Sequence, residues 1–176
     1  MHSDPPTDPI DPFEEHDHGA CASHALEHAL QHSEETGVRL TPVRRRALEI
    51  LLESHRAMGA YEVLERLVAD GFGNQPPVAY RALDFLVENG LAHRVQRLNA
   101  YAACLSPERD HSPVFLICRS CEKVAEAESP ELRQALRTLA SGSGFRIERT
   151  TVEVLGLCAV CAAAEAATEA SSEAQP

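Results

Sequence analysis

Two pairs of cysteines, each with two residues between its members, carry the strongest chemical signal in this sequence. Cys118 and Cys121 form the first pair and Cys158 and Cys161 the second, in a chain with only six cysteines. Zinc prefers a tetrahedral set of thiolates, and this spacing lets both sulfurs of a pair reach one ion. The four cysteines therefore predict a structural zinc site.

The distance between the pairs indicates what such an ion would hold together. The pairs are separated by 36 residues (122–157), so one ion would join the strands that follow Ser112 to the last helix of the chain. The alternatives are a redox dithiol or four unrelated buried cysteines. A redox pair is usually single and lies near a βαβ pattern, which this sequence lacks.

The charge is distributed unevenly along the chain. The net charge of −11 combines −9 over residues 1–38 (nine acidic, no basic), +2 over residues 39–97 (nine Arg, seven acidic) and −4 over residues 98–176 (seven basic, eleven acidic). Fifteen of the sixteen basic residues are Arg, which binds phosphate or guanine through two hydrogen bonds. The small positive excess in the middle permits DNA binding without establishing it.

Neither a membrane span nor a secretory signal is expected. No apolar run approaches the roughly 18 residues that a membrane span requires, and the N-terminus is acidic. Cysteine pairs without such a signal are typical of a reducing compartment and of metal binding rather than disulfides. We therefore expect a cytoplasmic protein with no membrane association and no small organic substrate.

Hydrophobic periodicity and turn residues predict the helices and strands of the first half of the chain. Thr41 and Pro42 open a helix as N-cap and first residue, and Gly37 ends the helix before it. Four helices followed by a hairpin predict a winged helix-turn-helix, whose last helix enters the major groove of DNA. The expected helices cover residues 20–36, 42–52, 60–69 and 78–88, and the strands 91–96 and 100–105.

The second half of the chain predicts a small α/β domain that carries the four cysteines. Strands are expected at 114–117, 123–128 and 145–154, with a helix at 130–140 and an alanine-rich helix after the second cysteine pair. The fold class is therefore α+β. The expected divisions are a disordered acidic tail (1–19), a winged-helix DNA-binding domain (20–105), a hinge (106–112), the zinc domain (113–167) and a disordered tail (168–176).

Further motifs lie between residues 25 and 165, namely Leu40 to Arg44, Ala60-Tyr61, Pro77 to Leu83, Tyr101 to Cys104 and the two cysteine pairs. In this order and approximate spacing they resemble the ferric uptake regulator superfamily, and most closely its zinc uptake regulator branch. The resemblance implies a homodimeric metalloregulator in which residues 113–167 form the dimerisation domain. It also implies binding to double-stranded operator DNA and repression of zinc-acquisition genes when zinc is plentiful.

The resemblance further implies a sensor zinc site formed by His93, Cys104, His111 and Glu126. Two imidazoles, a thiolate and a carboxylate suit tetrahedral zinc. His93 and Cys104 belong to the predicted DNA-binding domain, and the other two to the hinge and distal domain, so a metal held by all four would fix the angle between the domains. Two zinc ions per chain are therefore expected, one structural and one regulatory.

Each sensor ligand taken alone has an ordinary alternative. His93 is equally compatible with a solvated or DNA-facing residue, and Glu126 has acidic neighbours at positions 122 and 128. Iron-sensing members often carry a His-His-Asp-His run before the first cysteine pair, and residues 109–112 lack two of those histidines. A thiolate ligand also favours zinc over iron or manganese.

DNA contacts are assigned by the resemblance to Tyr61 and Arg81, with Arg81 reading a base and Tyr61 facing sugar or phosphate. Arg44 and Arg45, in the first turns of a helix, are candidates for phosphate contacts, and Tyr80 is expected on the exposed face beside Arg81. The alternatives are a half-buried helix cap for the tyrosine and a solvated face for the arginines.

One departure from the family affects the start of this DNA-binding helix. Val78-Ala79 replaces the usual Thr or Ser followed by Val or Ile. Since valine can neither cap a helix nor donate to phosphate, Asn74 or Gln75 would have to substitute.

Histidines near the N-terminus form a second candidate group. His24, His28 and His32 recur every four residues, and Cys21 lies one turn earlier. A polar helix face is favoured here over an auxiliary zinc site.

Three other functions remain open at this point. One is a regulator of the same fold that responds to another metal or to peroxide, and another is a zinc-ribbon DNA-binding scaffold without sensing. An enzyme is disfavoured, because a four-thiolate site has no open position for water and no nucleophile–base pair stands out.

Overall fold

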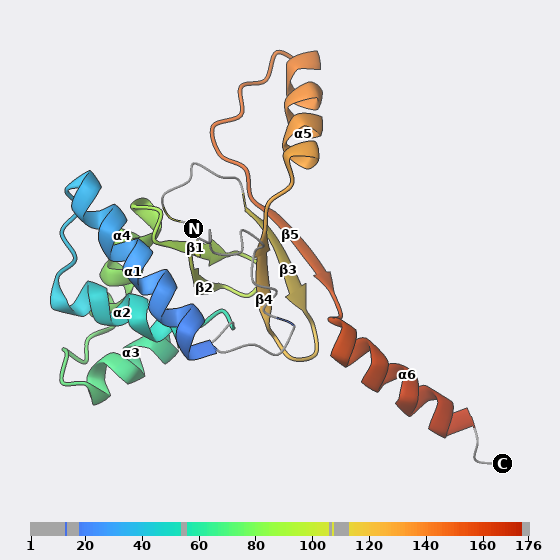
Figure 1. Cartoon of the computed structure of the whole chain (residues 1–176), viewed down its shortest axis with the longest axis horizontal. Helices are drawn as coiled ribbons and strands as arrows, with labels where there is room; N and C mark the ends of the chain where they lie inside the picture. Colours follow the sequence, from blue (N-terminus) through green and yellow to red (C-terminus); the bar gives the residue numbers. More distant parts are fainter. Residues whose placement is uncertain (1–12, 14–17, 54–55, 106, 108–112, 174–176) are drawn as a thin grey trace, which may run out of the picture.

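The computed structural model describes residue 13 and residues 18–53, 56–105, 107 and 113–173 of the chain. Within these residues it contains six helices and two β-sheets, so the fold is α+β as expected. Residues 18–105 form the winged-helix half and residues 113–173 the sheet half (Figure 1). None of the described helices is long and apolar enough to cross a membrane.

The winged-helix half has the expected order of elements. Gly37 ends α1 in the left-handed region, at a φ of 71°, and Pro42 begins α2 after Thr41. Asn99, at a φ of 47°, lies in the turn between the two antiparallel strands of the wing, β1 and β2. The elements are α1 (His18–Thr36), α2 (Pro42–Leu52), α3 (Ala60–Ala69), α4 (Pro76–Glu88), β1 (Ala92–Val95) and β2 (Ala100–Ala103).

A single apolar core holds these helices together. Each helix turns one face inward, at the three- and four-residue spacing that the sequence displays. Burial of a large aliphatic side chain stabilises the fold by about 1.5–3 kcal/mol, so the shared core fixes α4 against α2 and α3. Its fully buried members include Leu48, Ile50, Leu51, Val63, Leu67, Leu83, Leu86 and Leu91.

A three-stranded sheet organises the sheet half, in the order β4-β3-β5. The central strand β3 pairs antiparallel with β4 and parallel with β5. Parallel pairing requires a crossover, and the segment that contains α5 supplies it. The elements are β3 (Val114–Cys118), β4 (Val124–Ala127), α5 (Pro130–Gly142), β5 (Val152–Gly156) and α6 (Ala159–Glu173).

Two expectations about these elements are wrong. The strand expected over 145–154 is confined to β5, because Val152 is the partner of Val114, the first residue of β3. Residues 145–151 therefore have no ladder partner among the described residues and stay irregular. Residues 168–173, expected in a tail, are helical because α6 continues to Glu173, and its many alanines have the highest helix propensity.

The remaining boundaries differ little from the expectation. Helix α4 begins at Pro76 rather than Val78, since proline suits the first turn, where backbone N–H groups have no intrahelical acceptor. Most of the tail expected over 1–19 and of the hinge expected over 106–112 lies outside the described residues.

A second apolar cluster joins the two halves of the chain. The wing and the segment before α3 contribute small or branched side chains, and strands β3 and β4 contribute the side chains on the other side. An isolated antiparallel bridge between Arg56 and Lys123 adds a backbone contact. The cluster consists of Ala57, Val95 and Ala100 on one side and Phe115, Ile117 and Val124 on the other.

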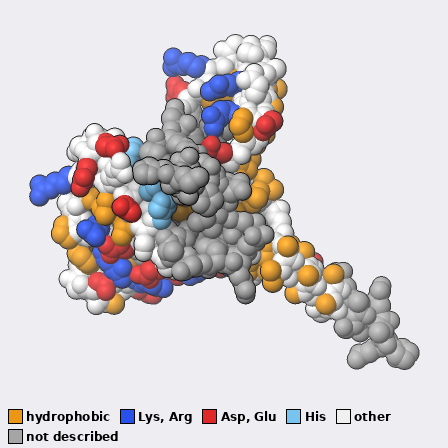
Figure 2. Space-filling view, viewed as in Figure 1, with side chains coloured by type: hydrophobic (Ala, Val, Ile, Leu, Met, Phe, Trp, Pro, Cys, Tyr) orange, Lys and Arg blue, Asp and Glu red, His pale blue; other side chains and the backbone are white. Residues whose placement is uncertain are grey.

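Helix α5 and strand β5 leave apolar side chains uncovered. No residue of α5 is buried; Leu139 on this helix is 75% exposed, and Phe145, in the segment after it, is 67% exposed. Val154 and Leu155 on β5 are also exposed. Helices α5 and α6 project from the body in Figure 1, and Figure 2 shows hydrophobic side chains along α6 and beside the base of α5. An uncovered apolar surface of this kind is typical of a protein interface.

Candidate metal centres

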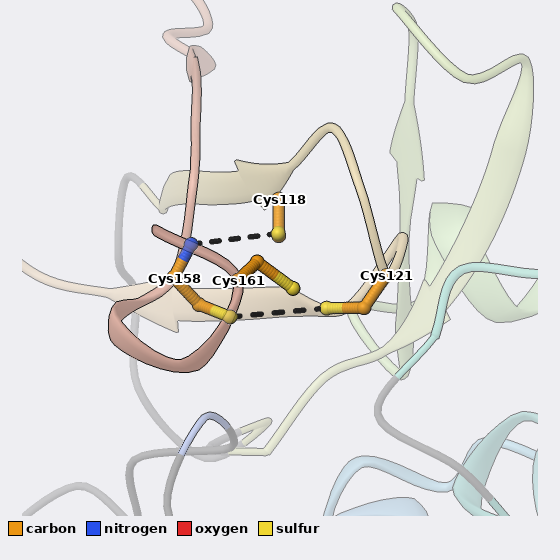
Figure 3. A group of neighbouring side chains, drawn as sticks. All are labelled: Cys118, Cys121, Cys158 and Cys161. Atoms are coloured by element: carbon orange, nitrogen blue, oxygen red, sulfur yellow. Dashed lines mark hydrogen bonds between the residues drawn. The ribbon is translucent and has the colours of Figure 1, made fainter. Parts of the chain in front are cut away.

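The four cysteines of the two C-x-x-C pairs lie together at one end of the sheet. Their sulfur atoms are all within 4.8 Å of one another, and those of Cys121 and Cys158 are 4.0 Å apart. Figure 3 shows the four side chains converging from the two turns. In a tetrahedral site with Zn–S bonds of about 2.3 Å, the sulfurs would be about 3.8 Å apart. The donor set and its spacing therefore fit a zinc ion.

Backbone pairing explains why the two turns meet. Cys118, the last residue of β3, is the register partner of Gly156, the last residue of β5, so the second pair begins two residues beyond that point. The Arg119 N–H donates to the Gly156 carbonyl at 2.9 Å. The Arg119 side chain reaches α6 as well, where it donates to both carboxylate oxygens of Glu165 at 2.7 Å. The first turn is thereby tied to β5 and to the last helix.

The electrostatics of the four thiols favour a bound cation. Burial raises the pKa of Cys118, but backbone N–H groups, including that of Cys158 at 3.4 Å, outweigh it and lower that pKa to about 6. The hydroxyl of Ser120 lowers the pKa of Cys161, but the interactions with Cys158, Cys118 and Cys121, together with burial, outweigh it and raise that pKa to about 12. One thiolate thus makes deprotonation of the neighbouring thiols less favourable, and a bound divalent cation would offset this repulsion between negative charges.

A second group forms where the wing meets the sheet. His93 lies on β1, Cys104 directly follows β2, and Glu126 lies on β4. Their ligand atoms are within 4.8 Å of one another, and His93 Nε2 is 3.2 Å from Glu126 Oε1. Cys104 is 1% exposed, and the side chains of His93 and Glu126 are 16% and 10% exposed. Three of the four predicted sensor ligands are therefore adjacent and shielded from water.

The protonation of His93 reflects these surroundings. Burial lowers its pKa, but hydrogen bonds to Cys104 and Glu126, together with their negative charge, outweigh burial and raise it to about 9. At neutral pH the His93 ring is thus protonated beside Cys104 and Glu126. A nitrogen, a thiolate and a carboxylate held this closely suit zinc, which would have to displace that proton.

The other predicted ligands differ in what the structure says of them. His111 lies outside the described residues. The rings of His24 and His28 are 4.2 Å apart, but the described residues bring no third ligand atom within reach of both. The side chain of Cys21 also lies outside the described residues, so the choice between the favoured polar helix face and an auxiliary site there stays untested.

The candidate DNA contacts fall into two classes. Tyr61 and Tyr80 are 63% and 40% exposed, and their rings meet edge to face with centroids 6.4 Å apart. Arg81 is exposed beside Tyr80 on α4 and makes no ion pair within the described part of the chain. Tyr61 and Tyr80 thus form one exposed aromatic surface at the junction of α3 and α4, and Arg81 is the next residue along α4.

Arg44 and Arg45 have partners within the protein. The guanidinium carbon of Arg44 lies 3.5 Å from the centre of the Phe85 ring, and its Nη1 donates to the Arg39 carbonyl at 3.1 Å. Arg45 pairs with Glu49 at 2.9 Å. These contacts hold each guanidinium against the protein, and a phosphate would have to approach the N–H groups that they leave unused.

Two residues beside the second group were not anticipated from the sequence. Phe115 packs its ring 5.4 Å from the His93 ring and is 1% exposed. Residues 114–117 are all apolar, so the sequence indicates neither which of them face inward nor what they contact. Glu153 accepts hydrogen bonds from the backbone of Gln96 and Arg97, more than 50 residues earlier.

Comparison with known proteins gives consistent results. The sequence model described as the ferric uptake regulator family matches residues 35–155. The zinc uptake regulation protein of Escherichia coli (strain K12) is 37% identical over 130 residues, which cover 73% of this chain and 76% of that protein. A solved structure of a zinc uptake regulator complexed with zinc and DNA has a TM-score of 0.77 at 33% identity, covering 82% and 97% of the two chains. The structure of holo XcZur has a TM-score of 0.71 at 34% identity, covering 84% and 99%.

Proposed function

The chain belongs to the ferric uptake regulator family, within its zinc uptake regulator branch, and from this premise we propose that it is a zinc-responsive transcriptional repressor. It binds operator DNA as a dimer when zinc is replete and represses zinc uptake genes, in the cytoplasm. The observation that carries this proposal is the buried group of His93, Cys104 and Glu126, which takes its ligands from both halves of the chain.

Two zinc ions bind each chain, one with a structural role and one with a regulatory role. Cys118, Cys121, Cys158 and Cys161 hold the structural ion, which ties β3 to the start of α6. His93, Cys104 and Glu126, with His111 as the fourth ligand, hold the regulatory ion. When bound, zinc supplies a fixed tetrahedral link among these side chains.

Regulation follows from where the second set of ligands lies. His93 and Cys104 flank the wing, which follows the DNA-binding helix α4, whereas Glu126 belongs to the sheet. Holding all of them at one point limits the angle between a DNA-binding domain (20–105) and a dimerisation domain (113–167) about a hinge (106–112). A 100-fold change in DNA affinity requires this restriction to favour the DNA-binding arrangement by only about 2.7 kcal/mol.

The dimer is formed through the uncovered apolar surface of α5 and β5. A second copy of the chain would bury Leu139, Phe145 and Leu155, whose exposure is otherwise unfavourable. The two DNA-binding surfaces, each carrying Tyr61, Tyr80 and Arg81, would then face successive major grooves of a palindromic site. Arg81 reads a guanine, and the tyrosines contact sugar or phosphate.

The proposal is tested by following DNA binding while zinc is withdrawn in steps. Duplexes are first selected from a random library at saturating zinc, and their affinity is then measured during titration with a chelator. We expect removal of the more weakly bound zinc to abolish specific binding while one zinc per chain and the dimer persist. If the affinity for specific DNA stayed unchanged when this zinc is removed, the protein would instead be a non-sensing DNA-binding scaffold.

A further inference from the structure

A carboxylate of the sheet half binds the backbone at the tip of the wing. Glu153 accepts a hydrogen bond from the N–H of Gln96 at 2.6 Å through one oxygen and from the N–H of Arg97 at 2.9 Å through the other. Residues 96–99 form the turn between β1 and β2. Two successive N–H groups directed at one anion resemble the backbone concavities that bind anions in proteins, and such charge-assisted hydrogen bonds are stronger than neutral ones.

The sheet places this carboxylate in line with the candidate sensor ligands. Phe115 of β3 is the register partner of Glu126 on β4 and also of Glu153 on β5. Directly paired residues on neighbouring strands project from the same face, so these three side chains form one row across the sheet. We call Glu126, Phe115 and Glu153 the docking row.

Strand β1 is held by the docking row at both of its ends. Near its start, His93 contacts the ring of Phe115 and the carboxylate of Glu126. Immediately after its end, the N–H groups of Gln96 and Arg97 meet Glu153. Between the two points, Val95 is fully buried in the apolar cluster that joins the halves.

We propose that Glu153 is a positioning residue that anchors the wing to the sheet without metal and thereby sets the angle of the DNA-binding surface. The regulatory ligands fix only one end of β1, and a strand held at one end can still pivot. Glu153 removes this freedom, so both contacts are needed for the arrangement that binds DNA. The inference rests on the proposed function for its effect on DNA, but the contact itself does not depend on it.

The experiment compares Glu153→Gln and Glu153→Ala with the wild type in the full, zinc-loaded chain. Glutamine keeps the size of the side chain, but its amide NH₂ faces a backbone N–H and one hydrogen bond is lost. Alanine removes both acceptors. The matched control is Glu148→Gln, which removes the same charge from an exposed side chain whose ion pair among the described residues is with Arg146.

We expect three changes in the Glu153 variants and none in the control. Hydrogen exchange at the amides of Gln96 and Arg97 becomes at least about tenfold faster, which corresponds to about 1.4 kcal/mol. Affinity for selected DNA at saturating zinc falls by about the same factor. Sensor zinc binds more weakly, because the docking row contacts the sensor ligands directly. The four-cysteine zinc stays bound, because its four ligands lie beyond the docking row, where β3 and β5 end. A purely local structural role would not move the last two quantities.

The outcomes separate the possible errors. Unchanged amide exchange would mean that the contact is absent from the zinc-loaded protein, which overturns the inference. Faster exchange with unchanged DNA affinity and unchanged sensor zinc affinity would overturn the positioning role. If the wild type itself showed no zinc-dependent DNA binding, the proposed function would fail, and the exchange rates would still decide whether Glu153 anchors the wing.

Discussion

The elevated pKa of His93 leads to a quantitative prediction for the protein that retains the four-cysteine zinc but lacks sensor zinc. The pKa rises from 6.5 to about 9 because Cys104 and Glu126 favour the protonated ring more than burial disfavours it. A group whose pKa is raised by folding stabilises the fold fully below its unfolded pKa, and this contribution is lost as the pH rises through the folded pKa. His93 should therefore contribute stability at pH 6 that is largely gone at pH 9.5.

The size of this contribution follows from the shift. A difference of about 2.5 units corresponds to about 3 kcal/mol at about 1.36 kcal/mol per unit. The side chains of His93 and Glu126 are only 16% and 10% exposed, so solvent screening reduces this figure little. We expect His93→Gln to cost about 3 kcal/mol more unfolding free energy at pH 6 than at pH 9.5, relative to the wild type.

Two measurements check this expectation. Chemical denaturation of wild type and His93→Gln at both pH values gives the double difference, in which the titration of other groups largely cancels. NMR titration of the labelled imidazole gives the pKa of His93 directly, with Glu126→Gln as a control in which that pKa should fall. A wild-type pKa near 6.5 would refute the reasoning, because it would mean that the three side chains do not pack together before zinc binds.

In the proposed sensor site, the same proton would compete with zinc. A histidine with a pKa of about 9 weakens zinc binding by roughly 100-fold between pH 8 and pH 6, whereas one with an ordinary pKa weakens it only about fourfold. Sensor zinc should therefore leave the protein on mild acidification, as followed by competition with a chelator of known pH dependence.

Three further predictions concern single residues. Cys104→Ala should leave a folded dimer with one zinc per chain that no longer binds DNA when zinc is added, as measured by metal content and DNA titration; wild-type binding would contradict the sensor assignment. Cys118→Ala should lose the structural zinc, the dimer and much helicity, measured by metal content, sedimentation and circular dichroism; a stable dimer would exclude the structural role. Arg81→Ala should weaken specific DNA binding by about 1–3 kcal/mol without changing zinc content, with the exposed Arg146→Ala as a neutral control.

Local signals in the sequence predicted most of the helices, because caps and periodicity act within one element. Thr41, Pro42 and Gly37 mark helix ends through their own backbone chemistry, wherever the helix later packs. The two cysteine pairs are equally local, since each turn brings its own sulfurs together. The clustering of the four cysteines could thus be anticipated from spacing alone.

The extent of β5 and the contacts of Glu153 could not be predicted from the sequence, because both depend on the register between strands that are far apart in the chain. Residues 145–151 alternate as a strand would, but the parallel pairing of β5 with β3 begins only at Val152. Glu153 reads as an ordinary polar residue of an edge strand, and its partners are backbone N–H groups that carry no side-chain signal. His93 and Glu126 were placed by resemblance to a family, because a lone histidine or glutamate does not indicate a ligand.

The same register also makes the two candidate metal centres depend on each other. The four-cysteine group lies where β3 and β5 end together, at Cys118 and Gly156. Three residues earlier on each strand, Phe115 of β3 is the register partner of Glu153 on β5. Phe115 is also the register partner of Glu126 on β4. An ion at the cysteines would therefore keep the docking row aligned with β1. Among the described strands, β5 pairs only with β3, at the edge of the sheet. Loss of the ion at the cysteines should therefore disturb the sensor ligands, although the two sites have no residue in common.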